Sequence, residues 1–169
     1  MTQLGTCSFM ARQQNVVFQG FTAPRKSYLG RAIAKRACEH RMRTPHALNI
    51  RAHYVRMPHL EEAWVAAQYT PGGAGKCLRK YADFALLVLC ELLLDRSTES
   101  MRCMFMVLME RRYGKTLTVF GTQYSQMDCH QRLGSGVNAD AIMDRIIHNT
   151  VWVEIGTYNM REHIALASA

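Results

Sequence analysis

The sequence has no uninterrupted hydrophobic run long enough to cross a membrane. Its longest apolar stretch, FALLVLCELLL at residues 84–94, contains Glu91, whereas a membrane-spanning helix needs roughly 18 or more apolar residues with few or no charges. The N-terminal MTQLGTCSFMARQQN also lacks the basic start, apolar core and small-residue cleavage site of a signal peptide. We therefore expect a soluble, cytoplasmic protein.

The cysteines lack the spacing of a disulfide framework or a metal site. The six cysteines are scattered, and no two form a C-x-x-C pair, so we expect reduced thiols, as in the cytoplasm. A structural metal site built on Cys129 and His130 would lack the ligand spacing of zinc sites. A cysteine hydrolase built on Cys90 is disfavoured, because a thiol flanked by LLVL and ELLL is typical of inert core.

Acidic residues are scarce relative to basic ones. The chain has 13 Asp and Glu against 21 Lys and Arg, for a formal net charge of +8. Such a balance favours a polyanionic partner, because phosphate neutralisation with counterion release gives sequence-independent affinity. The alternative is that the most basic stretch, RKSYLGRAIAKRACEHRMR at residues 25–43, is only the solvated face of a helix.

The chain of 169 residues, 49% of them hydrophobic, is long enough for one folded domain with a substantial core. Strand-like and helix-like segments alternate, which predicts βαβ units and an α/β fold with a mainly parallel, five-stranded sheet. The expected strands are 15–20, 52–57, 83–94, 116–123 and 150–155, and the expected helices are 26–43, 59–69, 97–112 and 137–149. Residues 44–50 and 70–77 are expected to be connections without regular structure, GGAGKC at 72–77 being a flexible loop.

One strand-to-helix junction has part of the pattern of a phosphate-binding loop. In GFTAPRKS the residues Gly20, Lys26 and Ser27 occupy the places that G-x-x-x-x-G-K-[ST] requires. Glycines are missing at Ala23 and Arg25, where they would permit positive φ or close approach of the backbone to phosphate. By itself this match favours an ordinary strand-to-helix turn over a nucleotide site.

The buried run LLVLCE at 86–91 has part of a second nucleotide-site motif. Nucleotide hydrolases of the P-loop class support Mg²⁺ with an acid after such a strand and need a second group that orients the attacking water. Glu91 stands at the place of the water-orienting carboxylate, and Cys90 at the place of the metal-supporting acid. A neutral thiol is a poor partner for a hard cation. A core strand that merely ends in Glu is the alternative.

Two further polar positions could contribute to the same chemistry. Thr122 and Gln123 end the next strand, where a side chain could hydrogen-bond a phosphate or the attacking water, or could simply be solvated. Arg145 lies on an otherwise apolar helix, where it could supply positive charge to a neighbouring subunit's nucleotide or pair with a carboxylate.

Taken in order, these segments resemble the IstB-like ATP-binding proteins, the transposition helpers of bacterial insertion sequences related to the DnaC and DnaA branch of AAA+ ATPases. The resemblance runs from about residue 7 to residue 163 and is most specific in HQRLGSGVNADAIMDRIIHNTVWVEIGTYNMRE. It implies a P-loop fold of AAA+ type, three layers α/β/α, over residues 1–169 as a single ATPase core domain, with the family's N-terminal helical region absent.

The resemblance also implies roles for individual residues. Glu91, Thr122, Gln123 and Arg145 would be catalytic, Arg145 as an arginine finger. The cofactor ATP would be bound by Gly20, Thr22, Arg25, Lys26, Ser27, Tyr28 and Arg161, and Mg²⁺ by Ser27 and Glu91. The implied activity is ATP-dependent assembly of a homo-oligomer on DNA, which presents target DNA to a transposase of the same insertion sequence.

The sequence departs from the family pattern in both catalytic motifs. The loop reads GFTAPRKS instead of a glycine-rich GxTGxGKS, Cys90 replaces the first Walker B acid, and the segment 44–53 resembles an insertion. Joint loss of these groups removes preorganised electrostatic stabilisation and predicts impaired hydrolysis. It fits a decayed copy of the element or a chain altered by design. The alternative function is a basic DNA-binding module with a dead nucleotide site.

Overall fold

The computed structural model describes residues 8–20, 25–42 and 51–155, and for residues 25 and 40–42 the backbone alone. The predicted insertion at 44–53 therefore lies largely outside the described residues. Thr22 and Arg161 also lie outside them, as does the side chain of Arg25.

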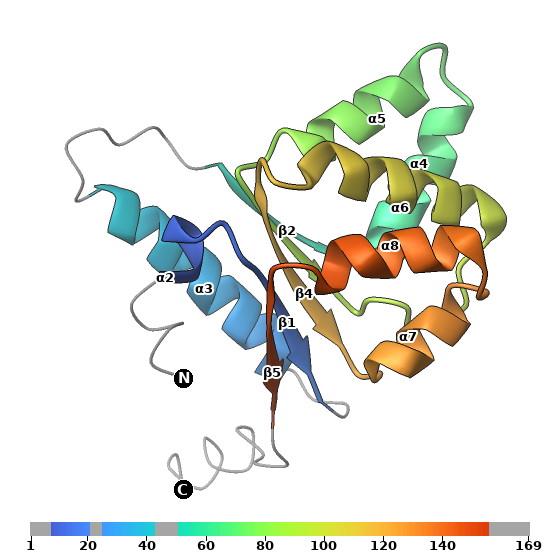
Figure 1. Cartoon of the computed structure of the whole chain (residues 1–169). Coiled ribbons are helices and arrows are strands. Elements are labelled where there is room, and N and C mark those ends of the chain that lie inside the picture. Colours follow the sequence, from blue (N-terminus) through green and yellow to red (C-terminus); the bar gives the residue numbers. More distant parts are fainter. Residues whose placement is uncertain (1–7, 21–24, 43–50, 156–169) are drawn as a thin grey trace, which may run out of the picture.

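A single sheet of five strands forms the centre of the molecule (Figure 1). The strand order is β2-β3-β4-β1-β5, and every neighbouring pair is parallel. The strands are β1 (Asn15–Gln19), β2 (Ala52–Arg56), β3 (Leu86–Cys90), β4 (Leu117–Thr122) and β5 (Thr150–Glu154). This confirms the predicted α/β class and the five-stranded parallel sheet.

Helices cover both faces of the sheet, which makes three layers (Figure 1). One face carries α2 (Ser8–Ala11) and α3 (Arg25–Met42). The other face carries α4 (Met57–Gln68), α5 (Gly73–Ala82), α6 (Glu99–Arg112), α7 (Gln126–Arg132) and α8 (Val137–Ile147). None of the helices in the described part of the chain is both long and apolar enough to span a membrane.

The central strand β3 explains why the core has two halves. All five of its side chains are buried, and alternate residues point to opposite faces of a sheet. Leu86, Val88 and Cys90 pack in the α3 half of the core, while Leu87 and Leu89 pack in the half beneath α4 to α8. A near-continuous apolar run is expected of a parallel strand with both faces covered.

The same strand is shorter than its apolar run predicts. The expected strand 83–94 is observed only from Leu86 to Cys90, because Glu91 and Leu93 both adopt φ of +59° and turn the chain out of the sheet. Leu92 and Leu93 are still buried, since the turn folds back into the core. Hydrophobicity reports burial, and here it does not distinguish strand from buried turn.

Besides the four-residue α2, which was also not predicted, two helices differ from the expectation. The GGAGKC segment was expected to be a flexible loop, but α5 begins at Gly73, after a left-handed Gly72 with φ of +68°. Its apolar side chains, among them Tyr81, pack onto the core, and this contact outweighs the low helix propensity of glycine. The second is α7, whose start is stabilised by a capping box between Ser125 and Asp128.

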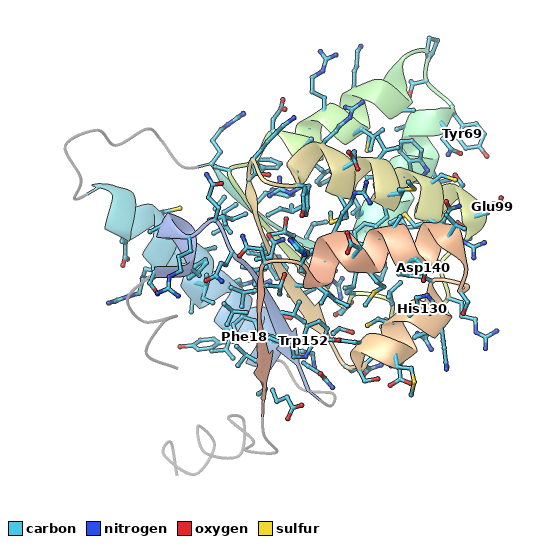
Figure 2. All side chains as sticks on the ribbon, in the orientation of Figure 1. Phe18, Tyr69, Glu99, His130, Asp140 and Trp152 are labelled. Carbon is cyan, nitrogen blue, oxygen red and sulfur yellow. The ribbon has the colours of Figure 1, made fainter. Side chains whose placement is uncertain are left out.

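Two side-chain pairs connect neighbouring elements, and Figure 2 labels both members of the first and Trp152 of the second. His130 of α7 and Asp140 of α8 lie 2.7 Å apart, between Nε2 and Oδ1. At the edge of the sheet, Trp152 of β5 donates from Nε1 to Oε1 of Gln19 at 2.6 Å. The carboxyl end of β1 is thereby held against β5, next to the start of α3.

Candidate functional site

A cavity of about 1000 Å³ opens at the carboxyl ends of the strands. In parallel α/β sheets ligands bind in the crevice outside these ends. The described residues that line it come from the starts of α3 and α4, from β2, from the end of α5 and from the residues at or after the ends of β3 and β4. The volume is at the upper end of the range for small-molecule sites.

Lys26 and Ser27 bring the start of α3 to this cavity. The Lys26 Nζ donates to the carbonyl oxygen of Gly20 at 2.6 Å, so the amine reaches over the end of β1. Burial lowers the pKa of Lys26, and the neighbouring Cys90 partly offsets this effect. A partly desolvated amine at the start of a helix is well suited to an anionic ligand.

Gly20 has a structural requirement of its own. A Cβ at this position would lie 2.8 Å from the carbonyl oxygen of Ile155, which follows β5. The Gly20 N–H donates to the carbonyl oxygen of Thr122 at 3.2 Å. Glycine is therefore needed here for the close approach of neighbouring strands, whatever its role toward a ligand.

Cys90 lies buried beneath the start of α3. Burial raises the pKa of its thiol, and hydrogen bonds with Ser27 and Tyr54 partly offset that rise. A Cβ on Gly121 would lie 3.3 Å from the sulfur, so the thiol also contacts β4. The group beside Ser27 is thus neutral and already hydrogen-bonded to it, unlike the carboxylate of a metal-binding pair.

Glu91 lines the same cavity as Lys26. Its carboxylate lies 3.7 Å from the guanidinium of Arg56, at the end of β2, and both side chains are partly exposed. Arg56 Nη2 also lies 2.6 Å from Nε2 of His59. The sequence hypothesis placed the strands that end at Gly20 and Glu91 side by side. That adjacency is wrong, because β4 lies between β1 and β3, but the two strand ends still reach one cavity.

The predicted pair at the end of β4 is divided between two faces. Gln123 lines the cavity, and its Nε2 donates to the Tyr124 hydroxyl at 3.0 Å. The buried hydroxyl of Thr122 points the other way, donating to the Leu92 carbonyl and accepting from the Tyr124 N–H, both at 3.2 Å. Thr122 therefore holds the turn after β3, and only Gln123 faces the cavity.

Two other predicted residues lie away from the cavity lining. Arg145, on α8, forms an ion pair with Glu110 of α6 and donates from Nη1 to the Ala141 carbonyl at 2.8 Å. Pairing with a carboxylate was the alternative considered from the sequence. Tyr28 is 61% exposed on α3.

Sequence reasoning missed several of the residues that line the cavity. Arg31, His53, Tyr54, Arg56 and Lys80 all contribute to it. A signal existed, since residues 51–56 carry two arginines, a histidine and a tyrosine beside a predicted strand. Using it required the knowledge that β2 lies next to β3, which depends on the strand order.

The described residues contain no group of three or more His, Cys, Asp and Glu side chains placed to hold a metal ion. Cys129, the thiol considered for such a site, is buried, and its sulfur lies 3.7 Å from the Thr122 hydroxyl. None of the five cysteines in the described ranges forms a disulfide: Cys38, Cys77, Cys90, Cys103 and Cys129.

The sequence matches the family model described as IstB-like ATP binding protein over residues 1–168. A protein of Sinorhizobium fredii named as an insertion sequence ATP-binding protein is 28% identical over 153 residues. That match covers 90% of this chain and 58% of the relative, so the chain spans less than two thirds of the relative's length.

Solved structures share the fold at low sequence identity. The DnaC helicase loader superposes with a TM-score of 0.71 at 19% identity, covering 92% of this chain and 88% of that one. The AMPPCP-bound DnaA of Aquifex aeolicus gives a TM-score of 0.70 at 14% identity, covering 97% of this chain and 48% of that one. At these identities the likeness establishes the three-layer P-loop fold of AAA+ type.

Proposed function

The chain belongs to the family of IstB-like ATP-binding proteins, and on this basis we propose that it is an ATP-binding helper of DNA transposition. In this proposal it assembles on DNA as a homo-oligomer and presents target DNA to a transposase, while its own ATP hydrolysis is impaired. The observation that carries the proposal is the convergence of Lys26, Ser27, Glu91 and Gln123 on one cavity at the carboxyl edge of the sheet.

The residues at the start of α3 have the chemistry to bind a nucleoside triphosphate. Lys26 places an amine at the start of α3, beside backbone N–H groups of the first helical turn, which is where phosphate oxygens are bound in this class of site. On leaving the Gly20 carbonyl, the Lys26 amine would bind the outer phosphates. Its pKa, lowered by burial, would rise again beside the phosphate charge.

The fit to Mg²⁺ rests on two oxygen donors, the Ser27 hydroxyl and the Glu91 carboxylate. When bound, the ion would neutralise charge on the phosphates. Gln123 would orient the attacking water together with Glu91. Cys90 offers a protonated sulfur in place of a carboxylate, and Mg²⁺ prefers oxygen ligands.

Impaired hydrolysis follows from how these groups are held. Ser27 shares a hydrogen bond with the Cys90 thiol, so its hydroxyl lies beside a neutral sulfur instead of a carboxylate that would help to hold a cation. Glu91 is paired with Arg56, whose guanidinium competes with water for the carboxylate oxygens. Losing one preorganised electrostatic group costs about 3–4 kcal/mol of transition-state stabilisation in other enzymes, or about 10²–10³ in rate.

Arg145 is proposed to act on the nucleotide of a neighbouring subunit. Within its own chain it is paired with Glu110, so the pair would have to open on assembly. The cost of opening is small, because Glu110 is 60% exposed and surface ion pairs contribute about 0–1 kcal/mol.

The alternative is a basic DNA-binding module whose nucleotide site is dead. Two features of the site favour it. The Lys26 amine is already hydrogen-bonded to the Gly20 carbonyl, and the Cys90 thiol stands at the place of an acid. The net charge of +8 suits either function.

Nucleotide-dependent thermal stability separates the two. With ATP and Mg²⁺ we expect a small rise in the melting temperature of the parent chain. Lys26→Ala should abolish this rise. The matched control Lys35→Ala, which changes an exposed lysine on the same helix, should show the same rise as the parent. The double variant Arg25→Gly and Cys90→Asp should show a larger, Mg²⁺-dependent rise and faster turnover. The alternative would be established if ATP changed the melting temperature of neither the parent chain nor the double variant, while the affinity for DNA stayed strongly salt-dependent.

A further inference from the structure

We propose that the surface along the outer edge of β2 binds the phosphate backbone of duplex DNA. This inference rests on the proposed function for the identity of the partner, and adds where that partner is bound. We call the surface the β2 edge surface. It consists of Arg31, Arg51, His53, Tyr54, Lys80 and Phe84.

The surface lies at the side of the sheet farthest from β5. Among the described strands β2 is outermost, and within these residues it pairs on one side only, with β3. In Figure 1 it lies between α3 on one face and α4 and α5 on the other. Side chains from α3, β2 and the end of α5 therefore meet along one open edge, continuous with the cavity that contains Lys26 and Glu91.

Two arginines on this surface lie over aromatic rings. The Arg31 guanidinium carbon lies 4.3 Å from the centre of the Tyr54 ring, and that of Arg51 lies 5.9 Å from the centre of the Phe84 ring. Within the described residues neither guanidinium makes a hydrogen bond or an ion pair. A guanidinium that stacks on a ring keeps its in-plane N–H donors available, and these match phosphate oxygens.

The aromatic support extends to the neighbouring groups. The His53 ring is stacked on Phe84 at 4.5 Å with an interplanar angle of 9°, and Lys80 Nζ lies 5.2 Å from the centre of the Tyr81 ring. Burial, and next the charge of Lys80, lower the pKa of His53. The positive charge at neutral pH is therefore carried by Arg31, Arg51 and Lys80.

This chemistry favours a DNA backbone over bases. The Tyr54 and Phe84 rings already contact cations, so unpaired bases would have to displace them in order to stack. Preorganised cations that contact phosphates need no access to base edges, and such contact suits a duplex of any sequence. Stacking also reduces the side-chain entropy lost on binding.

A second copy of this chain fits the surface less well. Three cations along an open edge call for an acidic partner, and the chain has only 13 acidic residues against 21 basic ones. Of those acids, Glu110 and Asp140 are already paired within the chain. The excess of positive charge makes self-association through this edge electrostatically unfavourable.

The test compares two triple variants with the same loss of charge. One is Arg31→Gln, Arg51→Gln and Lys80→Gln. The control is Arg96→Gln, Arg111→Gln and Lys115→Gln, three exposed cations elsewhere. Binding to a labelled 30-base-pair duplex is followed by fluorescence anisotropy across salt concentrations. Relative to the control, we expect the first variant to bind on the order of tenfold more weakly or worse, with a salt slope smaller by about 2–3, near one unit for each phosphate contact removed.

The results that would overturn this inference differ in what they imply for the proposed function. An equal loss of DNA affinity in both triple variants would overturn the assignment of the β2 edge surface and leave the proposed function intact. If the parent chain does not bind DNA, the DNA part of the proposed function is wrong as well. Tighter binding to a single strand than to the duplex would also overturn the inference. So would an altered sedimentation coefficient in the first variant with unchanged DNA affinity, which would point to a second copy. If the triple variant does not fold, Lys80→Glu alone, at an exposed position, should still weaken duplex binding more than Lys115→Glu.

Discussion

The guanidinium of Arg56 lies 3.7 Å from the carboxylate of Glu91, joining the carboxyl ends of β2 and β3 at the mouth of the cavity. Both side chains are partly exposed, so the pair contributes little to stability. A double-mutant cycle with Arg56→Ala and Glu91→Gln, measured by urea denaturation, should give a coupling free energy below about 1 kcal/mol. A coupling above about 2 kcal/mol would mean that the pair is buried and stabilises the fold.

Arg112 is a buried charged residue that holds several elements of the core together. It is 2% exposed, and it donates to the Thr118 hydroxyl at 2.9 Å, to the Phe84 carbonyl at 2.7 Å and to further carbonyls of residues 81, 82 and 117. Burial lowers its pKa to about 10, so it stays charged at neutral pH.

Arg112→Ala should therefore destabilise the protein by about 2–4 kcal/mol, because several buried carbonyls lose their donor. The measurement is the free energy of unfolding from a urea titration. The control is Arg111→Ala, at an exposed position next to it, expected within about 0.5 kcal/mol of the parent. Similar effects of the two substitutions would contradict the assigned role.

Two helical glycines should respond to alanine in opposite directions. A Cβ on Gly30 would lie 2.6 Å from Cγ1 of Val88, where α3 packs against β3, whereas a Cβ on Gly75 in α5 would meet nothing within 4 Å. Gly30→Ala should cost about 1–3 kcal/mol through overpacking. Gly75→Ala should add about 0.5–1 kcal/mol through helix propensity. Thermal melts of the two variants test this, and a stabilised Gly30→Ala would show that α3 is not held closely against the sheet.

The thiols should differ strongly in reactivity. Cys103 is exposed, whereas Cys90 is buried and burial raises its pKa. Since the thiolate is the reactive form, iodoacetamide at pH 7.5 should modify Cys103 within minutes and Cys90 only as the protein opens. Mass spectrometry of peptides from a time course measures both. Early modification of Cys90 would mean that the site beneath α3 is open to solvent.

Much of the fold follows from local patterns in the sequence. Each of the five strands is present, because apolar runs bounded by turn residues can be buried in few other ways. The boundaries were less well predicted, most clearly at 83–94, where the apolar residues after Cys90 belong to a turn. The helices α2, α5 and α7 were missed, since glycines obscured α5, while α2 and α7 are only 4 and 7 residues long.

Part of the candidate site was also accessible from the sequence. Lys26, Ser27, Glu91 and Gln123 were chosen from motifs, and the structure places all four on one cavity. Thr122 was chosen with equal reason, yet its side chain faces the opposite side of the sheet. The alternation of side chains along β4 separates these two neighbours, and the sequence alone does not say which of the two faces a ligand.

The sequence by itself determined the α/β class, the excess of positive charge and the position of the candidate phosphate-binding motif with Lys26 and Ser27, because these depend on residue type and local spacing. Tertiary structure alone decided that β4 separates β1 from β3 and that Arg56 meets Glu91. It also placed Arg31 of α3 and Arg51, which precedes β2, over aromatic rings along one edge of the sheet. The reason is that contacts between distant residues depend on strand order and on the direction of each turn. Both are set by packing of the whole chain.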